Sequence, residues 1–214
     1  MDLTRTRTRT TLHAVAELLL AGPQYAASGT IRLRVLPAGI GTVAAPDLRL
    51  EGTELTGPGG RHPLTGTYAE AAAAIGVEPR SLGDVYRDSV AVRAGDAIDV
   101  DTDRLAALLD ALARGAAALR AFAPPQEPVL WPEHLDVGIS LDEVNYGVSP
   151  GDASLPEPYA YVGPWTARQG RFWNQPFGAA RPLAALGDVD AIADFFGEGA
   201  GRAAVDPPRD VASS

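Results

Sequence analysis

Hydrophobic residues recur at helical spacing in three stretches of the chain. These stretches are residues 11–21, residues from 102 or 103 up to the prolines at 124 and 125, and residues 188–197. Each carries a hydrophobic residue every third or fourth position and is followed by glycine or proline, which commonly end a helix. The pattern therefore predicts three amphipathic helices. Thr67 and Glu70 add the capping box of a shorter one.

Alternating hydrophobic and polar residues predict β-strands in two other regions. Between residues 30 and 57, short alternating runs are separated by turns rich in proline and glycine. Parallel strands would need crossover connections of about a dozen residues, so this region predicts an antiparallel meander. Residues 136–143 and 159–162 predict two further strands joined by a proline-rich loop. The expected fold class is α+β, with antiparallel sheet(s) covered by helices.

Chain length indicates one compact domain. A chain of 214 residues is long enough to bury a sizeable core, and we expect that core within residues 1–200, with 11–100 and 101–200 as possible halves. Residues 1–10, which alternate threonine and arginine, are expected to form a solvated arm, and 201–214 a loose C-terminal tail. The segment after the arginines resembles a secretory signal, but charged residues interrupt it, so a cytoplasmic location is expected.

Composition excludes several classes of function. The 27 acidic residues outnumber the 18 basic ones, all arginine, and the net charge of −9 disfavours binding to nucleic acid. The chain has no cysteine, which excludes disulfides, a thiolate nucleophile and cysteine-type zinc sites. No hydrophobic run is long enough to span a membrane, so we expect no membrane partner.

The segment from Leu130 to Phe177 concentrates the unusual chemistry. It holds all three tryptophans, and no lysine or arginine occurs between Ala121 and Ala167. Large rings beside carboxylates could line a pocket for a small molecule or a cation. The predicted ligand-binding residues are Trp131, Asn145, Tyr146, Tyr159, Tyr161, Trp165, Trp173 and Asn174.

The same segment suggests two chemical alternatives. Carboxylates with one histidine could hold a divalent metal ion, and the candidate ligands are Glu133, His134, Asp136 and Asp152. Alternatively, a carboxyl group packed against rings could act as the general acid of a carboxylate- or metal-dependent hydrolase. The candidate catalytic residues are Glu133, His134 and Glu157. The spacing matches no established metal or catalytic motif, so whether the protein is an enzyme stays open.

Two other features add alternatives. The aromatic residues could instead form a protein-interaction or oligomerisation surface, which leaves a homo-oligomer possible. His13 and Glu17, one helical turn apart, could be a metal pair, although a surface or partly buried ion pair is the favoured interpretation.

Several strings also identify a resemblance. LWPEHLDVGI, DEVNYGVSPGD, PEPYAYVGPW and FWNQPFGAAR resemble a set of uncharacterised proteins from high-GC actinobacteria. The resemblance covers most of the chain and implies no activity, cofactor or site residue.

Overall fold

The computed structural model describes residues 3–87 and 89–209 and divides the chain into two compact units. The first unit comprises Met1–Ala113 with Val129–Asp136, and the second comprises Arg114–Pro128 with Val137–Ser214. The expected α+β class is confirmed, because helices accompany strands whose described pairings are all antiparallel. The units differ from the halves expected from sequence, since the segment 114–136 passes from one unit to the other and back.

The first unit contains the predicted meander. Its strands are β1 (Leu33–Leu36), β2 (Gly39–Thr42), β3 (Arg49–Glu51), β4 (Glu54–Gly57), β5 (Gly60–Pro63) and β6 (Val129–Trp131). They are ordered β6-β1-β2-β3-β4-β5, so only β6 joins out of chain order. Consecutive strands pair through short turns, as the prolines and glycines predicted.

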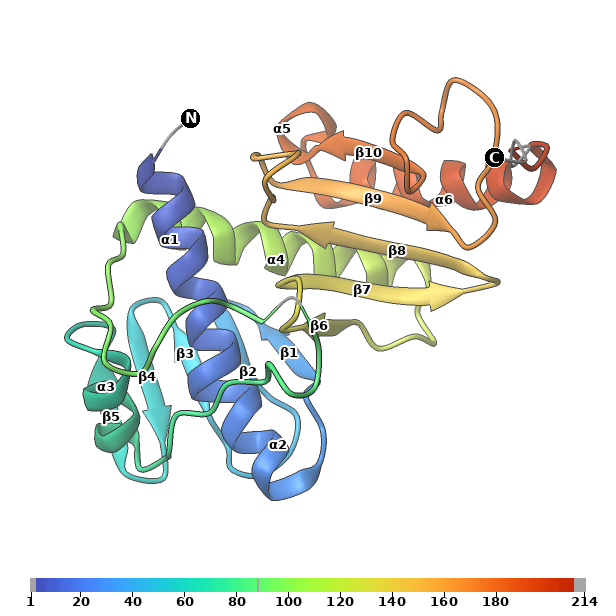
Figure 1. The fold of residues 1–214 in the computed structure, drawn as a ribbon. Helices are drawn as coiled ribbons and strands as arrows, with labels where there is room; N and C mark the ends of the chain where they lie inside the picture. The colour runs from blue at the N-terminus through green and yellow to red at the C-terminus, as the bar shows by residue number, and fades with distance from the viewer. Residues whose placement is uncertain (1–2, 88, 210–214) are drawn as a thin grey trace. The chain divides into compact units, whose positions relative to one another are not determined.

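A long helical rod packs against this meander. It consists of α1 (Leu3–Ala14), the π-helix η1 (Val15–Ala21) and α2 (Gly22–Ser28), and Figure 1 shows it crossing the strands. The predicted arm at residues 1–10 is wrong over its described part, because the helix begins at Leu3. The predicted helix end at Gly22 is wrong, because α2 continues the rod from that residue. Pro23 lies in the first turn of α2, where the backbone N–H groups have no partner within the helix, so the N–H that proline lacks is not missed.

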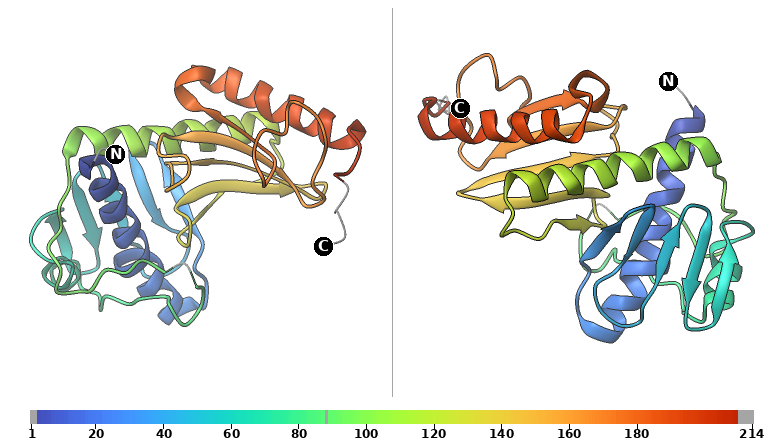
Figure 2. Two further views of the ribbon diagram at one scale, coloured as in Figure 1. Left: turned by 45° about the horizontal axis from the view of Figure 1, so that its top comes forward. Right: turned by 180° about the vertical axis from the view of Figure 1, so that it is seen from behind.

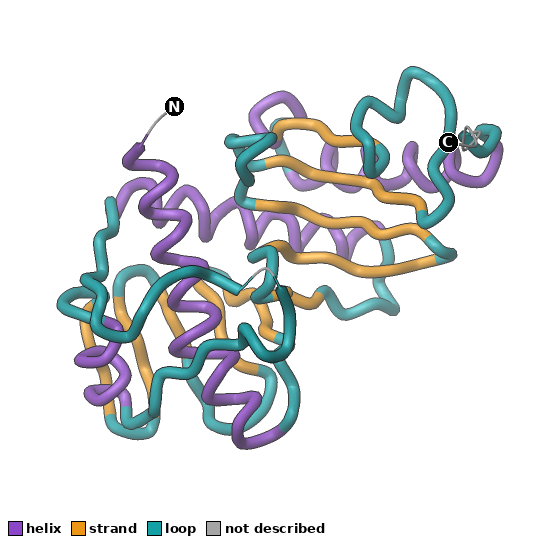
Figure 3. Tube along the Cα trace, in the orientation of Figure 1, coloured by secondary structure: helices purple, strands orange, loops and turns teal. Residues whose placement is uncertain are grey.

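All seven residues of η1 are buried. Strands lie on one side of the rod, and the irregular segment between α3 (Tyr68–Ile75) and α4 (Thr102–Phe122) crosses its other side (Figure 3). The capping box predicted for α3 is confirmed, with the Thr67 side chain accepting from the Glu70 N–H.

The second unit is a four-stranded antiparallel sheet with helices on one face. Its strands are β7 (Asp136–Leu141), β8 (Val144–Ser149), β9 (Tyr159–Pro164) and β10 (Ala179–Pro182), in the order β10-β9-β8-β7. The C-terminal part of α4 and α6 (Val189–Val205) lie on the same face, and α5 (Leu183–Leu186) connects β10 to α6 (Figure 2). Gly115 of α4 contacts Val148, and Gly199 of α6 contacts Val162, so small residues allow close helix–sheet packing.

The C-terminal region is more ordered than the sequence predicted. The predicted stop at Gly197 is wrong, because α6 continues to Val205. Beyond it, Gln169 N–H donates to the Pro207 carbonyl and Arg209 N–H donates to the Ala167 carbonyl. The part of the expected loose tail that is described is therefore helical and then hydrogen-bonded, while 210–214 lie outside the described residues. No described helix is both long and apolar enough to cross a lipid bilayer.

Candidate functional site

The second unit has one sheet face that none of its described helices covers. Tyr146 packs against Phe122 of α4 and Phe196 of α6, which identifies the covered face. Side chains alternate along a strand, so Asn145 and Gly147 lie on the opposite face. Their cross-strand partners Gly163 and Tyr161 share that face. Four of the predicted ligand-binding residues are gathered on this face or at its margin: Asn145, Tyr159, Tyr161 and Trp165.

A cluster of three rings occupies part of this face. The ring centroids of Tyr159, Tyr161 and Phe177 are 6.4 to 6.5 Å apart. The Tyr161 ring lies across Gly147. A Cβ added to Gly147 would be 2.5 Å from the Tyr161 Cζ atom. Tyr159 is mostly buried and donates to Asp152 at 2.7 Å, whereas Phe177 remains 44% exposed. The rings are thus fixed by packing, with Phe177 presented to solvent.

Trp165 is the most exposed ring of this group. Its side chain is 66% exposed, yet the indole Nε1 donates to Asn145 Oδ1 at 3.2 Å. Ser140 Oγ donates to the same oxygen at 2.7 Å, and the Trp165 backbone N–H donates to the Glu143 carbonyl at 2.9 Å. The indole is therefore held in one orientation while much of it faces water. We call Asn145, Tyr159, Tyr161, Trp165 and Phe177 the aromatic face.

The other predicted ligand-binding residues have structural roles. Tyr146 is buried in the helix-covered core, and burial, with the nearby Asp142 charge, raises its pKa to about 12. Trp173 is buried and donates to Asp206 at 2.9 Å, and Asn174 exchanges hydrogen bonds with the Ala180 backbone. Trp131 belongs to β6 of the first unit, where the Arg32 guanidinium lies over its ring.

The predicted metal ligands do not form a metal centre. Glu133 Oε1 lies 3.3 Å from His134 Nε2, but Asp152 is engaged by the backbone N–H groups of Ser154 and Leu155 and by Tyr159. Asp136 is buried at the start of β7. Across residues 3–87 and 89–209, no three histidine or carboxylate side chains are grouped to bind an ion.

The predicted catalytic residues are divided between the two units. Glu133 and His134 are neighbours in the first unit, and Glu157 is exposed on the loop before β9 in the second. None of the three belongs to the aromatic face.

Sequence reasoning missed a buried carboxylate network around Glu17. Glu17 is fully buried in η1 and accepts five hydrogen bonds, all from neutral donors. The donors are the hydroxyls of Ser81, Tyr86 and Ser89 and the backbone N–H groups of Leu82 and Val90. Burial raises the pKa of Glu17, but the hydrogen bonds outweigh burial and lower it overall. The expected ion pair is therefore replaced by a carboxylate that fixes the irregular segment to the rod.

His13 lies one turn before Glu17, and its pKa is lower than the ordinary value. Burial lowers its pKa more than the Glu17 charge and a hydrogen bond to the Pro132 backbone raise it. Proline has no N–H, so the imidazole donates to the Pro132 carbonyl. The Nε2 atom is buried without a partner among the described residues, which leaves Nδ1 as the donor.

These shifts predict loss of stability in acid. The folded-state pKa values of both groups lie below their ordinary values of 6.5 for His13 and 4.5 for Glu17. The unfolded chain consequently binds more protons, so the free energy of unfolding should fall as pH decreases through 6.5 and again through 4.5. Urea denaturation at pH 7.5, 5.5 and 3.5 would measure this fall. The decrease in the free energy of unfolding between pH 7.5 and 5.5 should be smaller in His13→Gln than in the wild type. An equal decrease in the two proteins would show that His13 is not responsible for it.

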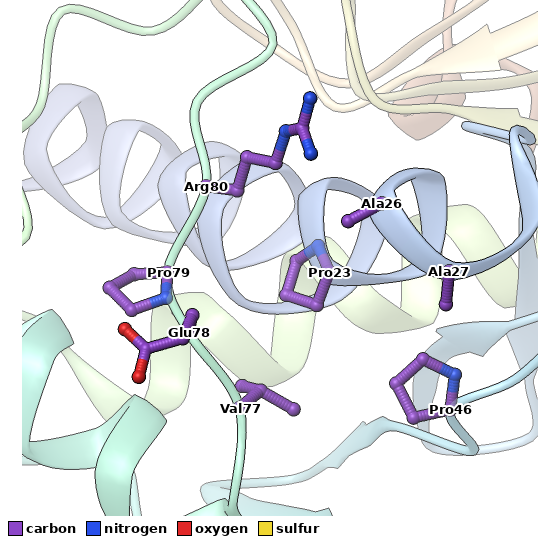
Figure 4. Close-up of a pocket in the computed structure, with 8 residues that line it drawn as sticks. All are labelled: Pro23, Ala26, Ala27, Pro46, Val77, Glu78, Pro79 and Arg80. Atoms are coloured by element: carbon purple, nitrogen blue, oxygen red, sulfur yellow. The ribbon is translucent and has the colours of Figure 1, made fainter.

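The first unit also contains an open hollow of about 500 Å³ (Figure 4). It is lined by Pro23, Ala26, Ala27, Pro46, Val77, Glu78, Pro79 and Arg80. The Glu78 carboxylate and the Arg80 guanidinium point away from the apolar side chains, and no predicted site residue contributes. Ligand pockets combine apolar walls with convergent polar groups, so this hollow is a weaker candidate than the aromatic face.

Comparisons with known proteins do not add a function. The chain matches no family model, no curated protein and no solved structure. Any functional conclusion therefore depends on the geometry of the sites.

Proposed function

We propose that this protein is a binding protein that recognises a small ring-containing ligand on the aromatic face. The observation that carries the proposal is Trp165, an indole that is 66% exposed and held by a hydrogen bond to Asn145. Exposed tryptophan is uncommon away from binding surfaces, because water solvates the large apolar ring poorly.

The fixed orientation of Trp165 favours binding. A flexible side chain loses conformational entropy when a ligand orders it, whereas this indole is already ordered by Asn145 and by the backbone hydrogen bond to Glu143. Covering roughly 100 Å² of apolar surface would contribute about 2.5 kcal/mol. That amount is sufficient for one ring to dominate the affinity for a small ligand.

Polar groups beside the rings would orient the ligand. Asn145 Oδ1 already accepts from Trp165 and Ser140, which directs the Nδ2 amide group away from those partners. Among the described residues that amide donor has no partner, and Asn145 is exposed. A stacking ring with an adjacent donor would suit a ligand that has a flat face and a polar edge.

Two-dimensional ¹⁵N NMR of the indole N–H groups would test this function. The three tryptophans give separately assignable signals, and Trp173, buried and bonded to Asp206, serves as an internal reference. A panel of phenyl compounds, indoles and pyranosides should include a ligand that shifts the Trp165 signal and leaves Trp173 unmoved.

Substitution of Trp165 should then lower the affinity for that ligand. We expect Trp165→Ala to weaken binding at least about tenfold, and Trp165→Phe to retain part of it because a ring remains. Trp131→Phe, in the first unit, is the matched control and should bind as the wild type does. Unchanged affinity in Trp165→Ala, or shifts confined to Trp131 and Trp173, would contradict the proposal.

A further inference from the structure

We infer that the ligand of the aromatic face is a saccharide, with one pyranose ring stacked on Trp165 and two adjacent hydroxyls bonded to Asn145 and Ser140. The inference rests on the proposed function and names the chemical class of its ligand. It follows from the hydrogen-bonding groups beside the exposed indole, because the structure fixes which of them donates and which accepts.

The orientation of the Asn145 amide is determined by its partners. The indole N–H of Trp165 can only donate, so the atom that accepts from it at 3.2 Å must be the carbonyl oxygen Oδ1. The Nδ2 group, with its two N–H donors, is therefore on the other branch of the side chain. Asn145 is exposed, and neither donor has a partner within residues 3–87 and 89–209. Gly163, the partner of Asn145 in β9, has no side chain to cover the amide.

Ser140 supplies the complementary group. It is the direct cross-strand partner of Asn145, and its hydroxyl donates to Asn145 Oδ1 at 2.7 Å. Because Oδ1 has no proton to give, the Ser140 proton is used in this bond and the Ser140 oxygen is left as an acceptor. Ser140 is exposed, and among the residues that the structure describes none donates to that oxygen. A donor and an acceptor thus lie side by side at the surface.

This pair of groups fits two adjacent hydroxyls. A hydroxyl both donates and accepts, so one hydroxyl of the ligand would accept from Asn145 Nδ2 while its neighbour donates to Ser140 Oγ. A carboxylate could use only the donor, and an ammonium group could use only the acceptor. Adjacent hydroxyls carried on a ring are the defining feature of a sugar, which makes a saccharide the ligand class that satisfies both groups together.

The position of this pair relative to the indole favours a pyranose over a flat heterocycle. The indole N–H bond lies in the plane of the ring, so Asn145 lies beside the ring edge and not over the ring face. A flat ligand stacked about 3.5 Å from the indole would hold its polar edge in its own plane, displaced from the amide. Pyranose carbons are tetrahedral, so their hydroxyls project obliquely toward groups level with the indole. The C–H groups of the sugar, which carry slight positive charge, would contact the electron-rich face of the indole.

Methyl pyranosides of gluco, galacto and manno configuration would test the ligand class. We expect at least one of them to shift the Trp165 indole signal and to leave the Trp173 signal in place. Cyclohexanol, which has a ring of similar size but a single hydroxyl, should bind at least about fivefold more weakly because it cannot satisfy both polar groups. Equal affinity for the pyranoside and cyclohexanol would overturn the inference, as would a Trp165 signal that none of the three pyranosides moves.

Deoxy derivatives of the tightest-binding pyranoside provide the second arm. Removal of either of two adjacent hydroxyls should weaken binding about three- to tenfold, the effect of one lost hydrogen bond, and removal of the other hydroxyls should change it little. In Ser140→Ala, the parent sugar should lose a similar factor, and one of those two hydroxyls should cease to affect binding because its partner is gone.

Ser154→Ala, which changes an exposed serine on the loop before β9, is the matched control and should bind the sugar as the wild type does. A phenyl compound that shifts Trp165 should bind Ser140→Ala and the wild type equally. If Ser140→Ala binds the sugar and its deoxy derivatives as the wild type does, the inference is wrong. A loss in Ser140→Ala that includes the phenyl compound would also overturn it, because Ser140 would then act by positioning the indole.

The two proposals fail in different ways. If a phenyl or indole compound shifts Trp165 while no pyranoside does, the saccharide inference is wrong and the proposed function stands. If neither the pyranosides nor any other compound of the panel moves the Trp165 signal, both are wrong.

Discussion

Glu17→Gln is expected to lower the free energy of unfolding by about 3–5 kcal/mol, because at least two buried donors would lose a hydrogen bond to a charged acceptor, each worth about 1.5–3 kcal/mol. The carboxylate accepts five hydrogen bonds, and both oxygens are used. A glutamine amide would turn N–H groups toward donors that also carry hydrogens, so several buried donors would lose their acceptor. The irregular segment should then detach from η1, which exposes part of the rod.

Urea denaturation followed by circular dichroism would measure the loss, and hydrogen exchange would locate it. The N–H groups of Leu82 and Val90, which donate to Glu17, should exchange much faster in the variant. Tyr86→Phe removes a single donor, so it should lower the free energy of unfolding by only about 1 kcal/mol. This variant should remain folded even if the Glu17→Gln protein does not. A Glu17→Gln protein as stable as Tyr86→Phe would show that the network contributes little.

The position of Glu17 could not be predicted because its partners are distant in sequence. The donors lie 64 to 73 residues after it, in a segment without periodic pattern. Helical periodicity placed Glu17 away from the hydrophobic stripe, and the expectation was a surface or partly buried ion pair with His13. That expectation failed because a loop covers the rod on the side away from the strands. The hydrophobic pattern of a helix predicts its buried face only when the rest of the protein covers a single side of that helix.

Local signals did predict the elements that are stabilised locally. The meander in residues 30–57 follows from short strands and turns, and the α3 cap depends on residues three positions apart. Strands β6 and β10, of three and four residues, escaped prediction. Their strand character comes from pairing with distant partners, as when Leu130 pairs with Leu33.

The aromatic residues of the candidate site could be identified from the sequence, but the sequence did not show which of them are buried and which are exposed. Trp165 and Trp173 lie in one stretch of similar composition. Trp173 is nevertheless buried and donates to Asp206, directly after the C-terminus of α6, whereas Trp165 is exposed. In the strands, alternation separates Tyr146 from Asn145. The alternation does not predict which face of the sheet the helices cover, because that face is determined by the packing of α4 and α6.

Gly147→Ala should destabilise the second unit by about 1–3 kcal/mol, the usual cost of forcing an extra methyl group into a packed position. The new Cβ would lie 2.5 Å from the Tyr161 Cζ and hydroxyl oxygen and 2.7 Å from Cε1. The Tyr161 ring would have to leave the strand surface, where it takes the space that a side chain on Gly147 would fill. Denaturation would measure the destabilisation, and NMR signals of Tyr161 and Phe177 would report the displaced ring.

Gly163→Ala is the matched control for this substitution. Gly163 faces the same side of the sheet, but an added Cβ would be 3.4 Å from its nearest neighbour, the Phe177 carbonyl oxygen, which is ordinary contact. Alanine there should change stability by less than about 1 kcal/mol, since it restricts the unfolded chain without a clash. Equal destabilisation by both substitutions would mean that any side chain is poorly tolerated on this face. A loss confined to Gly147→Ala would instead identify the Tyr161 ring as the obstacle, because the two sites differ chiefly in what a methyl group would meet.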